Sequence, residues 1–219
     1  MEWSSIQIRW KFPPDRKAMN YKDPKESIRQ KVWRLLEEKN IATFPRPCFN
    51  RIPNFVGSWI ASEKIKQIPE FNSSRCVFCA PDFVLKRIRE IVLESNKILA
   101  VALPHMAEFL EISERRNINR ATSIKGFKKY GVALKTEIGL FVEGSVAVDK
   151  KGNRLGKGRG YGDKEWSYLL ENNLLQREVK VITLVHDEQI LEDFSNLMTE
   201  GDKKVDYILT PTTIIKIDD

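Results

Sequence analysis

The chain has 219 residues, of which 42% are hydrophobic, and its 37 lysines and arginines exceed its 30 aspartates and glutamates to give a formal net charge of +7. This length suits one domain that buries roughly 70% of the surface of its unfolded chain. No apolar run reaches the ~18 residues that a membrane span needs, and the positive charge favours anionic ligands such as a nucleotide or a nucleic acid.

The N-terminal segment differs in character from the rest of the chain. Residues 1–22 lack the basic and apolar regions of a signal peptide and are broken by Pro13-Pro14, so we expect an irregular arm on a cytoplasmic protein. Residues 23–219 show no linker, repeat or low-complexity tract, and we expect them to form a single domain.

The cysteines are predicted to pack in the core rather than to form disulfides or bind a metal. There are three of them, too few for a disulfide framework. Cys76 and Cys79 have a metal or redox spacing, but they lie in an apolar run that predicts a buried strand. Residues three apart on a strand face opposite sides, so this pair is badly placed to chelate a metal. We therefore predict structural cysteines.

The first helix is predicted to begin at Asp23 and Pro24, an N-cap residue followed by proline at the first helical position, and to end near Lys39. Lys25 and Arg29 are four residues apart and share one face of this helix. Such a pair can bind an anion or simply face solvent, and its sequence alone leaves both readings open.

The segment 43–55 contains three prolines and cannot form a long helix. Arg46 and Arg51 lie among three phenylalanines, Phe44, Phe49 and Phe55. These side chains could hold a planar anionic ligand through stacking and charge, or they could form a packed loop with surface arginines.

Helices and strands then alternate, which predicts an α/β fold with a mainly parallel sheet covered by helices on both faces. The expected elements are helix 58–68, strand 75–80, helix 82–95, strand 97–103, helix 121–130, apolar runs 138–142 and 145–149, helix 163–175, strand 179–185 and a closing element at 205–215. Met106 and Phe109 follow the strand 97–103, at the edge where such folds bind ligands; they could contact a ligand or fill the core.

A glycine-rich loop between the apolar run and the helix 163–175 is the strongest functional signal. Gly156, Gly158 and Gly160 alternate with Lys157 and Arg159, and Arg154 precedes them. Glycines let the backbone approach a ligand closely, and the exposed N–H groups of such a loop can hold phosphate oxygens. A strand, a glycine loop and a helix N-terminus together present an anion site; the alternative is a mobile surface hairpin.

Two acidic features lie near the ends of these elements. Asp163 could bind Mg²⁺ beside phosphates or cap the following helix, and Glu165 is a substitute carboxylate if Asp163 is only a cap. His186 and Asp187 follow the strand 179–185, where such a pair is more often a hydrogen-bonded loop feature than a catalytic dyad.

The stretch Gly152-Asn-Arg-Leu-Gly-Lys-Gly-Arg-Gly-Tyr161, followed by Asp163, resembles the ATP-binding loop of the 5-formyltetrahydrofolate cyclo-ligase (methenyltetrahydrofolate synthetase) family, roughly G-x-R-L-G-x-G-x-G-Y-Y-D. The second tyrosine is Gly162 here, and the usual phosphate-binding lysine is Arg159. Gly-Tyr-Gly-Asp-Lys-Glu-Trp166 and the Phe-Pro-Arg-Pro and Arg-Ile-Pro-Asn-Phe pieces are more similar to a divergent branch, the methenyltetrahydrofolate synthetase domain-containing proteins.

The resemblance extends over about residues 23–217. It implies a three-layer α/β/α sandwich of the NagB/RpiA/CoA-transferase type. It also implies an ATP- and Mg²⁺-dependent ligase of one-carbon metabolism, which converts 5-formyltetrahydrofolate to 5,10-methenyltetrahydrofolate and releases ADP and phosphate. In that reaction the formyl oxygen attacks the γ-phosphoryl group, N10 attacks the activated carbon, and phosphate leaves. The protein mostly positions the reactants and neutralises charge.

Site roles follow from the same resemblance. Arg159 and Tyr161 would be catalytic, Asp163 would bind Mg²⁺, and Met106, Phe109 and Tyr161 would contact the reduced folate or related pterin. Residues implied to bind ATP are Lys25, Arg29, Arg154, Gly156, Lys157, Gly158, Arg159, Gly160 and Asp163. Lys25 and Arg29 must then converge on residues 154–163. The family's glutamate after the strand 75–80 is absent from Pro81-Asp-Phe-Val-Leu85, so the folate half of the site differs from the family pattern.

Two other functions stay open at this point. The chain could be an ATP-dependent enzyme acting on another pterin or small molecule, since the folate half diverges. It could also be a non-catalytic nucleotide- or RNA-binding relative, although no RNA-recognition motif with paired aromatic residues is visible. We expect no membrane partner, and either a monomer or a homodimer.

Overall fold

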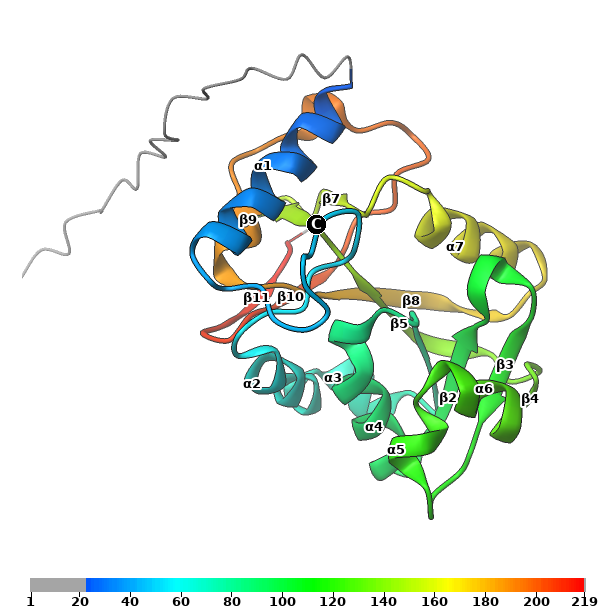
Figure 1. Ribbon diagram of the computed structural model, residues 1–219. Coiled ribbons are helices and arrows are strands. Elements are labelled where there is room, and N and C mark those ends of the chain that lie inside the picture. The colour runs from blue at the N-terminus through cyan, green and yellow to red at the C-terminus, as the bar shows by residue number, and fades with distance from the viewer. Residues whose placement is uncertain (1–22, 219) are drawn as a thin grey trace, which may run out of the picture.

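The computed structural model describes residues 23–218, so the arm predicted for residues 1–22 lies outside the described residues. An eight-stranded sheet has the strand order β11-β10-β8-β5-β1-β2-β3-β4 (Figure 1). Its strands are β1 (Cys76–Cys79), β2 (Ile98–Ala102), β3 (Phe109–Ile112), β4 (Val132–Ala133), β5 (Ile138–Gly144), β8 (Leu175–Leu184), β10 (Tyr207–Leu209) and β11 (Ile214–Lys216). A second sheet, in the order β7-β6-β9, contains β6 (Ala147–Asp149), β7 (Arg154–Leu155) and β9 (Ile190–Leu191).

The centre of the large sheet is parallel and its edges are antiparallel. Strands β10, β8, β5, β1 and β2 pair in parallel, whereas β3, β4 and β11 join in antiparallel fashion. Every residue of β1 and β5 is buried. Parallel strands covered on both faces are continuous apolar runs, which is why these segments showed no polar alternation in the sequence.

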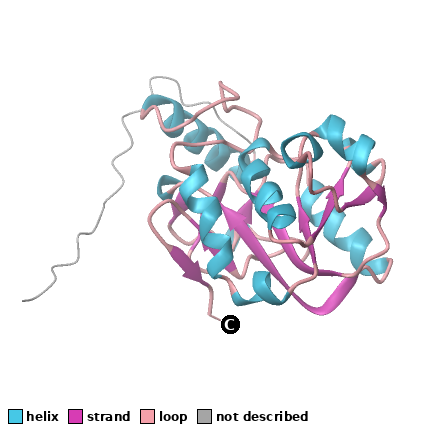
Figure 2. Cartoon of the chain, turned by 90° about the horizontal axis from the view of Figure 1, so that it is seen from below, coloured by secondary structure: helices cyan, strands magenta, loops and turns pink. Residues whose placement is uncertain are grey.

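Helices cover both faces of the sheet. Helix α7 (Tyr161–Glu171) lies on one face, where Trp166 packs edge-on against Phe141, which stacks on Phe78 with 4.4 Å between ring centroids. Helices α2, α3 and α4 lie on the opposite face, in front of the strands in Figure 2. The bounds of these three helices are α2 (Ser58–Glu63), α3 (Pro69–Ser73) and α4 (Lys86–Glu94). The remaining α-helices of the described residues are α1 (Pro24–Glu38), α5 (Ile118–Ala121) and α6 (Ile124–Tyr130). This confirms the predicted three-layer α/β/α arrangement.

The first helix forms as the sequence predicts. Helix α1 begins at Pro24, and the Asp23 side chain accepts a hydrogen bond from the Lys25 N–H at 2.9 Å. A carboxylate at the N-cap satisfies one of the four N–H groups that a helix leaves unpaired at this end.

The predicted boundaries of the helix 163–175 are wrong at both ends. Helix α7 begins at Tyr161, because Gly160 adopts the left-handed conformation and acts as its N-cap. Asp163 therefore lies inside the first turn and is not the cap. At the other end the helix ends at Glu171, and β8 begins at Leu175, earlier than the predicted strand 179–185.

The three cysteines pack in the core. Cys48, Cys76 and Cys79 are buried and unbridged. Burial raises the pKa of the Cys76 and Cys79 thiols to about 12, so neither forms a thiolate near neutral pH. None of the helices between residues 23 and 218 is long and apolar enough to cross a membrane.

Arg89 of α4 fixes the loop that follows β1. Its buried guanidinium donates to the Ala80 carbonyl at 2.7 Å and to the Asp82 carbonyl at 3.0 Å, and its Nε donates to the Thr122 carbonyl at 3.2 Å. These bonds hold residues 80–82 in place at the carboxyl end of the sheet.

We expect Arg89→Met to destabilise the protein by about 2–4 kcal/mol, because it leaves three carbonyl oxygens without a donor. Urea denaturation measures the change. Lys86→Met, on the same helix but partly exposed, is the control and should change stability by less than about 1 kcal/mol. Equal effects of the two substitutions would contradict the role assigned to Arg89.

Candidate active site

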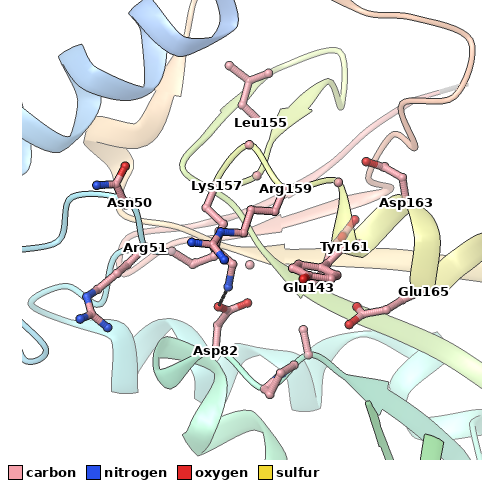
Figure 3. Close-up of a pocket in the computed structure, with 18 of the residues that line it drawn as sticks. Asn50, Arg51, Asp82, Glu143, Leu155, Lys157, Arg159, Tyr161, Asp163 and Glu165 are labelled. Carbon is pink, nitrogen blue, oxygen red and sulfur yellow. Dashed lines mark hydrogen bonds and ion pairs between the residues drawn. The ribbon is translucent and has the colours of Figure 1, made fainter. Parts of the chain in front are cut away.

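A cavity of about 520 Å³ opens at the carboxyl ends of the parallel strands (Figure 3). Its wall includes residues that follow β1 and β2, the last residues of β5, the glycine loop and the N-terminal turn of α7. This is where open α/β sheets bind ligands, and the volume lies in the usual range for small-molecule sites.

The glycine loop connects β7 to α7. Gly158 and Gly160 have φ angles of +87° and +63°, a conformation that side chains rarely adopt. Gly160 is the N-cap of α7 and no side chain caps this end. The first-turn N–H groups of an eleven-residue helix therefore face the cavity without a side-chain acceptor, which suits an anion.

Helix α1 supplies two cations to this loop from more than 120 residues away. The Arg29 Nε donates to the Gly156 carbonyl at 2.7 Å across a separation of 127 residues. A side chain at Gly158 would meet the Arg29 guanidinium at 3.3 Å. Lys25 also lines the cavity, where its Nζ pairs with Asp202 at 2.6 Å. Arg29 thus contacts the predicted segment 154–163, and Lys25 lines the same cavity but pairs with Asp202.

Most cations of the cavity already have carboxylate partners. Lys157 pairs with Asp82 at 2.8 Å, the dashed contact in Figure 3. Arg154 is buried and pairs with Glu143 at 2.9 Å and with Asp163 at 3.5 Å. Arg159 differs, because its exposed side chain makes no hydrogen bond or ion pair with any residue of the described range. Together with Arg51, which is also exposed and lines the cavity, it is available to an incoming anion.

Arg154, which precedes the glycines, lies buried under the loop. Its side chain is only 7% exposed and its Nε has no hydrogen-bond acceptor in the described structure. Its two carboxylate partners come from β5 and α7. The residue therefore holds the strand and the helix together beside the cavity.

Two buried carboxyl groups lie on the α7 side of the cavity. Burial raises the pKa of Glu143 to about 7, in spite of the neighbouring Arg154, with Asp163 and Asp82 adding to the rise. Burial also raises the pKa of Glu165 to about 8, and the charges of Asp82 and Glu143 raise it further. Carboxyl groups with such pKa values cluster at functional sites.

Gly162, where the family pattern has a second tyrosine, lies directly against the neighbouring ion pair. A Cβ at this position would lie 2.3 Å from Glu143 Oε2 and 3.0 Å from an Arg154 nitrogen. A larger residue at position 162 would therefore displace the buried Glu143–Arg154 pair.

Tyr161 lies at the first position of α7 and contacts the opposite wall. Its hydroxyl is 2.9 Å from His105 Nδ1, and both residues line the cavity. Met106 and Phe109 are not among the residues that line it. Phe109 instead stacks on Tyr168 of α7, with 4.6 Å between ring centroids, over the sheet. The geometry thus gives no support to a substrate contact by these two residues.

The remaining candidates divide between the cavity and the loops. Arg51 lines the cavity, whereas Arg46 pairs with Glu37 at 2.7 Å and is not part of its wall. His186 Nδ1 accepts a hydrogen bond from the Glu188 N–H at 3.1 Å, as expected of a loop feature.

Sequence reasoning missed Asp82, Glu143 and Asp202 as cavity residues. One signal was present, because Glu143 interrupts an apolar run that is otherwise a buried strand. A charge in such a position requires a partner, and here the partner is Arg154.

A divalent cation would have limited protein ligands here. Within residues 23–218, no group of three or more His, Cys, Asp or Glu side chains is arranged to hold a metal ion. Magnesium bound with a nucleotide commonly uses one or two carboxylates and takes its other ligands from phosphates and water. Asp163, at the cavity wall and 30% exposed, fits that arrangement.

The fold and the cavity define an α/β protein whose cavity is lined by a glycine loop, a helix N-terminus and several cations. A model of the 5-formyltetrahydrofolate cyclo-ligase family matches residues 21–211. The chain belongs to the 5-formyltetrahydrofolate cyclo-ligase family.

Curated relatives place it near a particular branch. A human methenyltetrahydrofolate synthase domain-containing protein is 37% identical over 202 residues, which are 87% of this chain and 53% of the relative. The Danio rerio protein of that name is 35% identical over 209 residues, 90% of this chain and 55% of the relative. The chain spans about half the length of these relatives. A mitochondrial 5-formyltetrahydrofolate cyclo-ligase from Arabidopsis thaliana is 33% identical over 92 residues, 36% of this chain and 30% of that protein.

Solved structures agree on the fold. The 5,10-methenyltetrahydrofolate synthetase of Aquifex aeolicus superposes with a TM-score of 0.57 at 19% identity, covering 89% of this chain and 93% of that one. The Mycoplasma pneumoniae 5,10-methenyltetrahydrofolate synthetase gives a TM-score of 0.51 at 16% identity, covering 85% and 98%. At these identities the likeness shows the fold alone, and it confirms the predicted fold class.

We expect Gly162→Ala to displace the Glu143–Arg154 pair and to destabilise the protein by about 1–3 kcal/mol, because the added methyl group overlaps Glu143 Oε2. Thermal and urea denaturation measure this effect. Gly201→Ala is the control, since a Cβ there meets nothing within 4 Å. A Gly162→Ala protein as stable as the parent would show that the pair can move freely.

The Glu165 carboxyl predicts a pH-dependent stability. Its pKa is about 8 in the folded protein against an ordinary 4.5, so the unfolded chain ionises first as the pH rises. Glu165 therefore lowers the free energy of unfolding. This loss is absent below about pH 4, grows between about pH 4.5 and 8, and is then constant. Glu165→Gln should therefore stabilise the protein by on the order of 1–4 kcal/mol at about pH 8 and by almost nothing at about pH 4. Urea denaturation across this range tests it, and a benefit independent of pH would contradict it.

Proposed function

We propose that this chain converts 5-formyltetrahydrofolate to 5,10-methenyltetrahydrofolate with hydrolysis of ATP to ADP and phosphate. The observation that carries the proposal is the convergence of Lys25, Arg29 and the glycine loop on the uncapped N-terminus of α7. Family membership supplies the reaction class. The curated relatives are about twice as long as the matched region, so the activity of this chain itself needs a direct test.

The ATP phosphates would lie against the glycine loop. Backbone donors would come from residues 156–160 and from the first turn of α7. Lys25 and Lys157 now pair with Asp202 and Asp82, and phosphate oxygens would take over part of those contacts. Arg159, which has no partner within residues 23–218, would meet the transferring phosphoryl group.

Asp163 would hold the Mg²⁺ that accompanies the nucleotide, with phosphate oxygens and water as the other ligands. The ion neutralises phosphate charge when it is bound. Arg154, 3.5 Å from Asp163, fixes the orientation of that carboxylate.

The chain's own residues then act by position and charge. The γ-phosphoryl group is transferred to the formyl oxygen, so Arg159 would stabilise charge that grows on the transferring group. Tyr161 lines the cavity from the first turn of α7, where its hydroxyl contacts His105, and it would face the substrate. Water exclusion would come from the apolar cavity rim.

The deciding measurement is ATP turnover with and without 5-formyltetrahydrofolate, with methenyltetrahydrofolate followed by its absorbance. We expect turnover that depends on the folate and yields one ADP per methenyl product. If only another formylated pterin drives ATP turnover, that pterin and not 5-formyltetrahydrofolate is the substrate. If the protein binds RNA in a salt-sensitive way and shows no ATP turnover, it is a binding protein and not an enzyme.

We expect Arg159→Ala to lower kcat by on the order of 10²–10³ while raising the KM for ATP much less, because the lost interaction is strongest in the transition state. Arg159→Lys should recover much of the rate, since it restores a cation. Arg116→Ala, at an exposed loop position outside the cavity, is the control and should retain the parental rate. Turnover of Arg159→Ala within about twofold of the parent, a change of only ~0.4 kcal/mol, would remove Arg159 from the mechanism.

A further inference from the structure

The cavity has two chemically different sides. The cations and the glycine loop form one side, which the nucleotide phosphates suit. The other side contains acidic and apolar groups: Asp82, Phe83, Pro104, Ile124 and Glu165. Phe83 and Ile124 are large apolar side chains with 44% and 39% exposure, and Phe83 packs edge-on against Phe44. Apolar surface open at a cavity mouth favours a planar ring as the second ligand.

Glu165 is the polar group of this side that lacks a partner. It is 6% exposed, yet it lines the cavity, and Figure 3 shows it pointing inward from α7. It makes no hydrogen bond or ion pair with the residues of the described range. Buried carboxyl groups are normally hydrogen-bonded, so an unpaired one aimed into a cavity indicates a ligand that donates to it.

Neighbouring groups decide what kind of ligand that is. The nearby cations Arg154 and Lys157 are already paired with Glu143 and Asp82, so neither is left to Glu165. Glu165 lines the cavity, so the space in front of its carboxyl group is open to a ligand. A planar ligand with two adjacent N–H groups would fill this space and satisfy both carboxyl oxygens.

We propose that Glu165 is the specificity residue for the pterin ring, and that its carboxyl oxygens accept the ring N3–H and the 2-amino group of the 2-amino-4-oxopyrimidine edge. This inference rests on the proposed function for the identity of the substrate. The ring would lie between this carboxyl group and the exposed face of Phe83.

The first test compares the binding of two ligands to Glu165→Gln by calorimetry. The glutamine keeps the shape but offers only one acceptor, so we expect binding of 5-formyltetrahydrofolate to weaken roughly 30- to 300-fold. Binding of a non-hydrolysable ATP analogue should change by less than about threefold. In turnover, the KM for the folate should rise while kcat changes little, which a general loss of structure would not produce. Glu171→Gln, at the exposed end of the same helix, should behave as the parent.

The second test removes the donor from the ligand. A 2-desamino analogue of 5-formyltetrahydrofolate should bind the parent roughly 10- to 100-fold more weakly than the natural substrate, and should bind Glu165→Gln as weakly as the natural substrate does. Equal losses from the analogue in both proteins would overturn the inference, because the 2-amino group would then contact another residue.

The remaining outcomes separate this inference from the proposed function. Folate-dependent turnover with an unchanged folate KM in Glu165→Gln would overturn the inference and leave the function intact. If the parent does not turn over 5-formyltetrahydrofolate, binding of 6-hydroxymethylpterin serves as the probe. Binding that Glu165→Gln abolishes would sustain the inference without the function, and absence of binding would overturn both.

Discussion

The hydrogen bond from Arg29 to the Gly156 carbonyl is the interaction on which the cavity depends. It fastens the first helix to the loop that precedes α7, across 127 residues of chain. A glycine suits position 158, because its φ is +87° and a Cβ there would lie 3.3 Å from the guanidinium. Arg29 is in turn held by Glu26 at 3.1 Å, so the cation is fixed before any ligand arrives. A preorganised donor loses little freedom on binding, which favours the recognition of a phosphate.

Charge balance links the cavity to the stability of the fold. The cations Lys25, Lys157 and Arg154 are each compensated by a carboxylate from a distant segment. These pairs keep like charges from repelling one another in the ligand-free protein. A nucleotide can then enter by exchange of partners rather than by neutralising bare charge. Arg159 and Glu165 also line the cavity, and neither has a hydrogen bond or ion pair with another residue between 23 and 218.

The sequence alone predicted most of the fold and the phosphate side of the proposed site. Continuous apolar runs predicted the buried parallel strands, because covered strands have no polar face. Asp23 and Pro24 predicted the start of α1, because caps act within a single turn. The glycine loop predicted the phosphate side, since glycine spacing and the adjacent helix are local in sequence. Boundaries failed where a glycine conformation decided them, as at Gly160.

What only the tertiary structure decided is which distant side chains meet. Asp82, Glu143 and Glu165 come from a loop, a strand and a helix, and no local pattern brings them together. Burial also set their chemistry, because the pKa of Glu165 depends on desolvation that a sequence does not show. The same holds for Arg154, whose place under the loop follows from its carboxylate partners. Neighbouring residues determine the helices, strands and turns, whereas the partner and the burial of each side chain depend on contacts between distant parts of the chain.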